Sequence, residues 1–139
     1  MRAIKVLWRL LGEQWALIAY WLIIVGVVSG LGAALFGFLD FTKIPGGTRA
    51  KRVARLHGLG NVVMVLLFVG SWFLRKDTIL EPPLLASLLC FAGAALSGLT
   101  GWLGGELVDR LGVGVEDGAH LNAPSSLSGR PAAEGAAAD

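Results

Sequence analysis

Three long uncharged stretches divide the chain, and charged segments separate them. They cover residues 15–39, 56–74 and 82–105. An α-helix rises ~1.5 Å per residue, so even the shortest stretch reaches about 28 Å, close to the ~30 Å of hydrocarbon in a bilayer. The pattern therefore predicts an all-α integral membrane helical bundle with three transmembrane helices spanning residues 15–115.

The first fourteen residues differ from the spans because they carry regularly spaced charge. Arg2, Lys5 and Arg9 recur at intervals of three and four, which places them on one face of a helix. We interpret residues 1–14 as an amphipathic interfacial helix or as the basic flank of the first span. A cleaved signal peptide is disfavoured, because the apolar run that follows is much longer than the core of a signal.

The segments between the spans predict an orientation. Residues 40–55 contain the helix-breaking Pro45-Gly46-Gly47 turn and five basic residues, which are Lys43, Arg49, Lys51, Arg52 and Arg55. The second loop, which we expect to contain Arg75, Lys76, Asp77 and Glu81, has no net charge. Because basic loops stay in the cytoplasm, we expect the first loop and the C-terminus on the cytoplasmic side of a bacterial plasma (inner) membrane.

The last part of the chain is rich in Ala, Gly, Ser and Pro. Residues 116–139 have few large apolar side chains, so we expect a disordered tail in which His120 is exposed to solvent. Just before it, Gly112-Val113-Gly114 does not match the GxGxxG pattern of nucleotide loops. We interpret this segment as the stop of a helix that residues 106–111 prolong into water.

Small residues recur every four positions in the first and third spans. Because small residues allow helix backbones to approach closely in lipid, these rows predict helix-packing surfaces. The residues concerned are Gly26 and Gly30 in the first span, and Gly93, Ser97, Gly101 and Gly105 in the third. A second row, Ala86, Cys90, Ala94 and Gly98, lies beside the latter and widens it into a groove for two partner helices.

Composition supports the membrane class and narrows the function. Hydrophobic residues make up 55% of the chain and charged residues 16%, below the ~25% that is usual for soluble domains. The net charge of +2 does not favour binding to nucleic acid. The single cysteine, Cys90, can form no disulfide within the chain, and we interpret it as a buried apolar residue.

Four polar side chains are expected at one membrane face: Asp40 ends the first span, His57 and Asn61 open the second, and Glu106 follows the third. Ionisable groups at membrane depth are candidates for function. Two interpretations remain open for this set. The residues could form a cofactor site, or His57 could hydrogen-bond Asp40 or Glu106 and simply fix the helix ends.

Three segments carry a resemblance to a known family: AYWLIIVGVVSGLGAALFGFLDF, IPGGTRAKRVARLHGLGN and SGLTGWLGGELVDRLGVGV. From Ala19 to Val115 the chain resembles a family of small bacterial membrane proteins called domain of unknown function 2231. The resemblance implies four membrane helices, the first with a His-Pro motif and a second histidine. Because residues 1–14 are too short and too charged to replace that helix, we expect either a truncated gene start or a three-span variant.

The resemblance also touches on chemistry. Relatives often carry a histidine where Leu111 stands here, and some are fused to a Rieske iron–sulfur domain. The tail has neither the Cys-x-His nor the Cys-x-x-His that such a cluster needs, so the implied electron-transfer role is weaker for this chain.

Two functions from different classes follow. The first is a helix-packing or partner-binding membrane module whose partners are the lipid bilayer and a second copy or another membrane protein. The alternative is a redox-associated protein that binds haem or quinone near His57; bis-histidine ligation would need a second intramembrane histidine. No metal site other than a haem at His57 is expected. No nucleophile–base pair is evident in the spans, so no enzymatic activity is assigned.

Overall fold

The computed structural model describes the chain from Arg2 to Gly135, with side chains for Arg9 and from Leu11 onward. The described part is all-helical and contains no strand. Three helices follow one another: α1 (Arg2–Lys43), α2 (Arg49–Arg75) and α3 (Leu84–Gly105). A π-helical turn, η1 (Glu106–Arg110), and a 3-10 turn, η2 (Ser126–Ser128), come after them. All three long helices are long and apolar enough to span a membrane, which confirms the predicted fold class.

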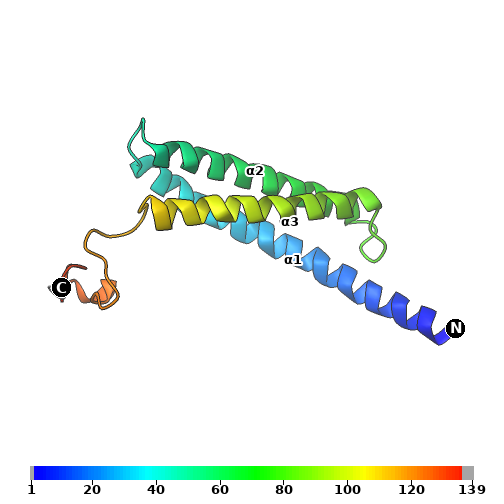
Figure 1. Cartoon of the computed structure of the whole chain (residues 1–139). Coiled ribbons are helices and arrows are strands. Elements are labelled where there is room, and N and C mark those ends of the chain that lie inside the picture. The colour runs from blue at the N-terminus through cyan, green and yellow to red at the C-terminus, as the bar shows by residue number, and fades with distance from the viewer. Residues whose placement is uncertain (1, 136–139) are drawn as a thin grey trace.

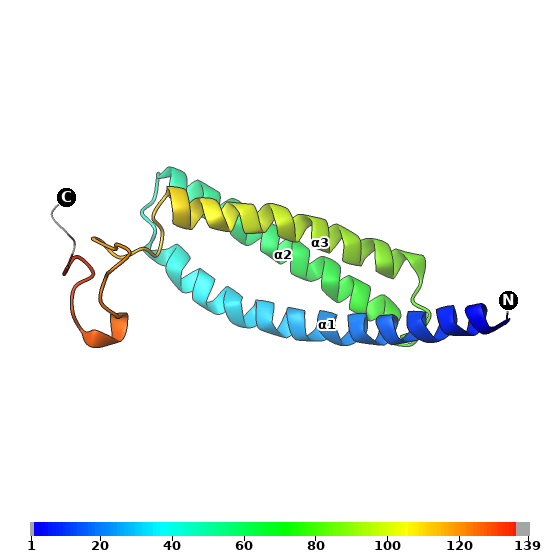
Figure 2. The same cartoon turned by 60° about the horizontal axis from the view of Figure 1, so that its bottom comes forward.

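Helix α1 is continuous from the N-terminal flank through the first span. The N-terminal flank and the first span therefore form one helix, with no separate interfacial helix between Arg2 and Lys43. At ~1.5 Å per residue its 42 residues reach ~63 Å, about twice the hydrocarbon thickness. Figures 1 and 2 show its blue N-terminal part projecting past the loop between α2 and α3, with α1 running obliquely to the other two helices. A helix with an uncharged stretch longer than the hydrocarbon thickness can fit a bilayer by tilting.

The boundaries of α2 and α3 differ from the uncharged stretches. Helix α2 begins at Arg49, nearly two turns before residue 56, because Thr48 caps it by accepting a hydrogen bond from the Lys51 amide at 3.1 Å. Helix α3 begins at Leu84, so Pro82 and Pro83 precede the helix and do not form its first turn. Pro83 is the N-cap and has an extended conformation (ψ 149°). Pro82 precedes a proline, and such a residue avoids the helical region.

Helices α2 and α3 pack as a tight antiparallel hairpin (Figure 2). The buried positions of α3 and its extension recur every seven residues: Ala86, Gly93, Thr100 and Leu107. A step of seven residues drifts only ~20° around a helix, so such a row stays on one face along its whole length. A step of four turns ~40°, so the predicted four-residue rows pass out of this interface.

Glycine makes the close approach of α2 and α3 feasible. A Cβ at Gly60 would lie 2.6 Å from Thr100 Cγ2, and one at Gly93 would lie 3.1 Å from the Phe68 ring. Both helices therefore contribute glycine to the same interface, and Phe68 packs directly over the backbone of α3.

Helix α1 is attached mainly at its two ends. Near one end, Arg9 lies 3.7 Å from Glu81 of the second loop. Near the other, Phe41 packs against the small core formed by Val53, Ala54 and Leu107, and Lys51 Nζ donates to the Phe41 carbonyl. Between these ends the backbone of α1 approaches α2 but not α3, and Ile23 is its one buried side chain among those described.

An apolar groove of about 370 Å³ follows the middle of α1, lined by Ile23, Gly26, Phe68 and Cys90 among others. Cys90 is half-buried at its edge, so it is a less buried residue than the sequence indicated. Beyond the groove, every residue from 33 to 40 is exposed, so this part of α1 packs on no other helix within the described residues.

Candidate functional site

Three residues at the polar end of the α2–α3 hairpin form what we call the histidine cluster: His57, Asn61 and Thr100. His57 Nδ1 lies 2.9 Å from the Thr100 backbone oxygen, and Asn61 Nδ2 lies 3.0 Å from His57 Nε2. A carbonyl oxygen can only accept and an amide nitrogen can only donate. His57 Nδ1 therefore carries the ring proton and donates to Thr100, while Nε2 accepts from Asn61.

The cluster depends on a glycine that the predicted rows do not include. A Cβ at Gly104 would lie 3.1 Å from His57 Cε1, so the imidazole rests directly on the backbone of α3. Gly104 is four residues from Thr100, and together they form the α3 side of the contact. The contact between His57 and Gly104 could not be predicted from sequence spacing, because the two residues belong to different helices.

The other two candidate residues make separate ion pairs. Glu106 accepts from Arg49 at 2.5 Å and joins the end of α3 to the start of α2. Asp40 pairs with Lys43 at 3.2 Å, one turn along α1, and both side chains are exposed. His57 bonds neither Asp40 nor Glu106, the partners that one of the two open interpretations suggested; its Nδ1 meets the Thr100 carbonyl of α3 instead. The four polar residues thus form three separate contacts.

The helix stop expected at Gly112-Val113-Gly114 is present. The π-helical turn η1 continues α3, with Leu107 buried and Glu106 in the Arg49 pair. Val113 N donates to the Leu107 carbonyl at 2.8 Å, and Gly112 has φ +63°, a conformation that disfavours side chains with a Cβ. The wide turn and its glycine end the helix.

A second polar cluster, which we call the arginine cluster, lies at the opposite end of the hairpin. Arg75 is 3% exposed and donates to the Ser71 hydroxyl at 2.9 Å and to the Ala86 carbonyl at 3.3 Å. The Ser71 hydroxyl itself donates to the Ala86 carbonyl at 2.6 Å. Placing Arg75 in the second loop was therefore wrong: it ends α2 and is buried against α3. In the sequence, the four-residue spacing of Ser71 and Arg75 is the feature that indicates that the two side chains share a helix face.

The predicted packing residues fall into three environments. Gly93 is buried beneath Phe68, as described above, and Gly30 would place a Cβ 3.7 Å from Val65 of α2. Gly105 is partly buried near Asp109 of its own helix. The remaining predicted positions do not pack on another helix within the chain. These are Gly26, whose added Cβ would meet no atom within 4 Å, exposed Gly101, and exposed Ser97, which donates to the Ala94 carbonyl.

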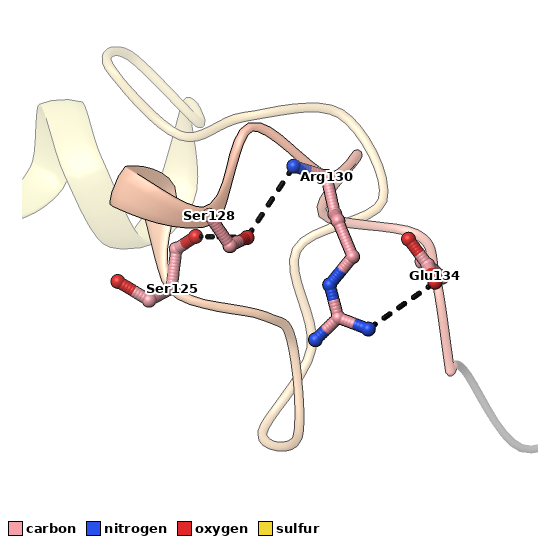
Figure 3. Close-up of polar contacts among 4 residues, drawn as sticks. All are labelled: Ser125, Ser128, Arg130 and Glu134. Carbon is pink, nitrogen blue, oxygen red and sulfur yellow. Dashed lines mark hydrogen bonds and ion pairs between the residues drawn. The ribbon is translucent and has the colours of Figure 1, made fainter.

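The tail contributes nothing to either cluster. Its contacts are local: the Ser128 hydroxyl donates to the Ser125 carbonyl at 2.6 Å, and Arg130 pairs with Glu134 at 3.3 Å (Figure 3). The element η2 makes no contact with the helices within the described residues. His120 is partly buried within this segment, where its Nδ1 accepts from the Asn122 amide at 3.3 Å.

The comparisons with known proteins identify the family. No curated protein and no solved structure gives a significant match. A family model described as "Predicted membrane protein (DUF2231)" matches residues 5–117, which include α2, α3 and all of α1 except its first three residues. The match extends further toward the N-terminus than the resemblance seen in the sequence. Because it covers most of the chain and the chain has three helices able to span a membrane, the protein belongs to this family of membrane proteins, domain of unknown function 2231.

Proposed function

We propose that this protein is a helix-packing membrane module, and that its α3 helix docks against α3 of a second copy. The observation that carries the proposal is a row of small residues on α3 that the hairpin leaves uncovered. Ala94, Gly98 and Gly101 are exposed, and a Cβ added at either glycine would meet no atom within 4 Å.

The uncovered row differs from the glycines that the fold already uses. Gly93 and Gly104 face α2 and would clash or crowd there if enlarged. Gly98 and Gly101 are exposed and lie outside that interface, and the backbone of α1 does not approach α3 closely. In lipid, helices associate through close backbone packing and not through the hydrophobic effect. A smooth, unused row is therefore suited to a second helix, while large apolar residues elsewhere face lipid chains.

The test compares two pairs of substitutions on the same helix. Chains labelled on the tail with a donor or an acceptor fluorophore are mixed in vesicles, and energy transfer is followed as lipid is added. Gly98→Leu with Gly101→Leu is expected to lower transfer at every dilution. The matched control, Ala92→Leu with Ala95→Leu, enlarges exposed small residues on other faces of α3 and should leave transfer unchanged. Equal effects of both pairs, or no transfer in the unmodified chain, would contradict the proposal.

The geometry gives less support to a redox site at His57. Both ring nitrogens are already engaged, so a haem iron or a quinone oxygen would have to displace Asn61 from Nε2. The hydrogen bond from His57 Nδ1 to the Thr100 carbonyl would stay in place. Histidines that bind a metal through one ring nitrogen commonly make such a bond through the other, so haem binding remains the alternative to test. Haem binding at His57 predicts a Soret band after supplementation that His57→Ala abolishes. The packing proposal predicts no such band.

We also propose that the membrane is the bacterial plasma membrane, with the first loop and the C-terminus in the cytoplasm. The basic residues predicted for the first loop lie instead in the helices that flank it: Lys43 ends α1, and Arg49, Lys51, Arg52 and Arg55 lie in the first two turns of α2. They still gather at this end of the hairpin, which is consistent with the positive-inside rule. Single cysteines introduced at Gly46 and Asp77, in a chain with Cys90→Ser, should differ in labelling by an impermeant reagent. Labelling at Asp77 from outside is expected, and labelling at Gly46 would reverse the orientation.

A further inference from the structure

Two arginines lie on the face of α2 that is directed away from both other helices. Arg52 and Arg55 are exposed, and within the described residues neither guanidinium makes a hydrogen bond or an ion pair. The neighbouring basic side chains are engaged: Arg49 pairs with Glu106, and Lys51 lies 3.6 Å from the centre of the Phe41 ring. Arg52 and Arg55 are therefore left with their charges uncompensated by protein.

The same face continues as an apolar stripe into the membrane. At 100° per residue, Arg52, Arg55, Leu59, Leu66 and Phe73 fall within one narrow sector of α2, opposite the buried residues that contact α3. Leu59, Leu66 and Phe73 are 65%, 62% and 59% exposed, which is the behaviour of lipid-facing side chains. Two arginines thus lie directly above a continuous lipid-facing stripe on a single helix.

The depth of the arginines can be estimated from the helix itself. The uncharged residues 56–74 rise about 28 Å, close to the hydrocarbon thickness of about 30 Å. Arg55 therefore lies at the hydrocarbon boundary, and Arg52 lies about 4.5 Å further out. This is the level of the lipid ester and phosphate groups, where a guanidinium can form paired hydrogen bonds with phosphate oxygens.

We propose that Arg52 and Arg55 form a binding site for an anionic phospholipid, with the phosphate held between the two guanidinium groups and an acyl chain lying along Leu59 and Leu66. The charge complementarity is local, since two unpaired cations meet the phosphate level above an exposed apolar stripe. A zwitterionic lipid offers the same tails, but its own cation offsets the attraction. The site does not depend on the docking of α3, because it lies on a different helix and a different face.

The test measures lipid selectivity in the full-length chain. The protein is reconstituted in phosphatidylcholine vesicles that contain traces of spin-labelled phosphatidylglycerol or spin-labelled phosphatidylcholine, and the immobilised fraction gives the relative association constant. The unmodified chain is expected to favour phosphatidylglycerol. Removing each arginine should reduce the preference severalfold, because each guanidinium supplies one of the two charge-assisted contacts to the phosphate. Arg52→Gln with Arg55→Gln should therefore abolish it.

A control with equal charge loss at the same membrane end separates a site from a diffuse field. Lys43→Gln with Arg110→Gln removes two exposed cations there and leaves Arg52 and Arg55 in place. This control is expected to keep most of the preference, and Arg52→Lys with Arg55→Lys should keep part of it. If both glutamine pairs lost the preference equally, the selectivity would come from general surface charge and not from a site at Arg52 and Arg55. An unmodified chain without selectivity would overturn the proposal outright.

Discussion

Asn61 lies one turn along α2 from His57, and its side-chain nitrogen is 3.0 Å from His57 Nε2. The tautomer of the ring is fixed on its other side, because the Thr100 carbonyl of α3 can only accept and the ring proton must therefore lie on Nδ1. Nε2 is then an acceptor, and the Asn61 amide supplies its donor from within α2. A backbone carbonyl of α3 thus determines which tautomer His57 adopts.

The first prediction concerns that tautomer. In the unmodified chain, nitrogen NMR at neutral pH should show a protonated Nδ1 and an unprotonated Nε2 in His57. In Asn61→Leu, Nε2 loses its donor while the Thr100 carbonyl still requires a proton on Nδ1, so we expect the same tautomer together with a loss of up to about 0.5 kcal/mol of stability, typical of one polar side-chain pair within a helix. A predominant Nε2–H form in the unmodified chain would show that the contact is assigned wrongly.

The second prediction tests the packing of His57 on Gly104. Gly104→Ala adds a methyl group 3.1 Å from His57 Cε1, so it should destabilise the hairpin by about 1–2 kcal/mol, measured by helix loss in mixed micelles of increasing denaturing detergent. Gly101→Ala adds the same methyl group with no atom within 4 Å and should be neutral or slightly stabilising.

A double substitution makes this test specific. In His57→Ala the obstacle to the new methyl group is gone, so Gly104→Ala should then cost much less than it does in the unmodified chain. The coupling between the two changes is expected to be about 1 kcal/mol, as for residues in contact. Additive effects would mean that Gly104 is needed for a reason other than His57.

The third prediction concerns the buried Arg75. Its guanidinium depends on the neutral acceptors Ser71 and Ala86, so Ser71→Ala leaves a buried charge with one acceptor fewer. We expect a loss of about 1–2 kcal/mol in the same detergent titration. Ser97→Ala is the matched control: Ser97 is exposed and bonds only to its own helix, and its removal should change stability by less than about 0.5 kcal/mol.

The fourth prediction concerns the end of η1. Gly112 has φ +63°, where a Cβ costs roughly 1–2 kcal/mol, so Gly112→Ala should destabilise the turn and weaken its amide protection in hydrogen exchange. Asparagine tolerates this conformation better than most residues, so Gly112→Asn should show a smaller effect. Equal protection in both variants and the unmodified chain would mean that the glycine is not what stops the helix.

The three spans were predictable because lipid imposes a simple rule. A chain can cross hydrocarbon only as a long uncharged helix, and residues 15–39, 56–74 and 82–105 satisfy that condition visibly. The positions of the helix ends were harder to predict from the sequence. Thr48 starts α2 while the chain is still basic, and α1 joins a charged flank to an apolar span without interruption.

The candidate site was predictable only in part. His57 and Asn61 share a helix, so their spacing revealed their proximity. Their partners on α3 depend on how two helices are rotated against each other, which no spacing within one helix discloses. The predicted glycine rows were drawn at intervals of four, whereas the actual interface of α3 follows intervals of seven through Gly93 and Thr100. Arg75 was expected in a loop because a charged residue next to an uncharged span normally lies in water, whereas Arg75 is buried at the end of α2.

The docking of α3 against a second copy is tested most directly by cross-linking within the membrane. In a chain carrying Cys90→Ser, a single cysteine is introduced either as Gly101→Cys or as Ala95→Cys, and vesicles are oxidised. Close packing through the uncovered row should bring the two copies of position 101 within the ~4.4–6.8 Å between Cα atoms that a disulfide needs, so dimers should form there. Position 95 lies on another face and should remain monomeric. Dimers that form equally at both positions, or at position 95 alone, would contradict the proposed interface.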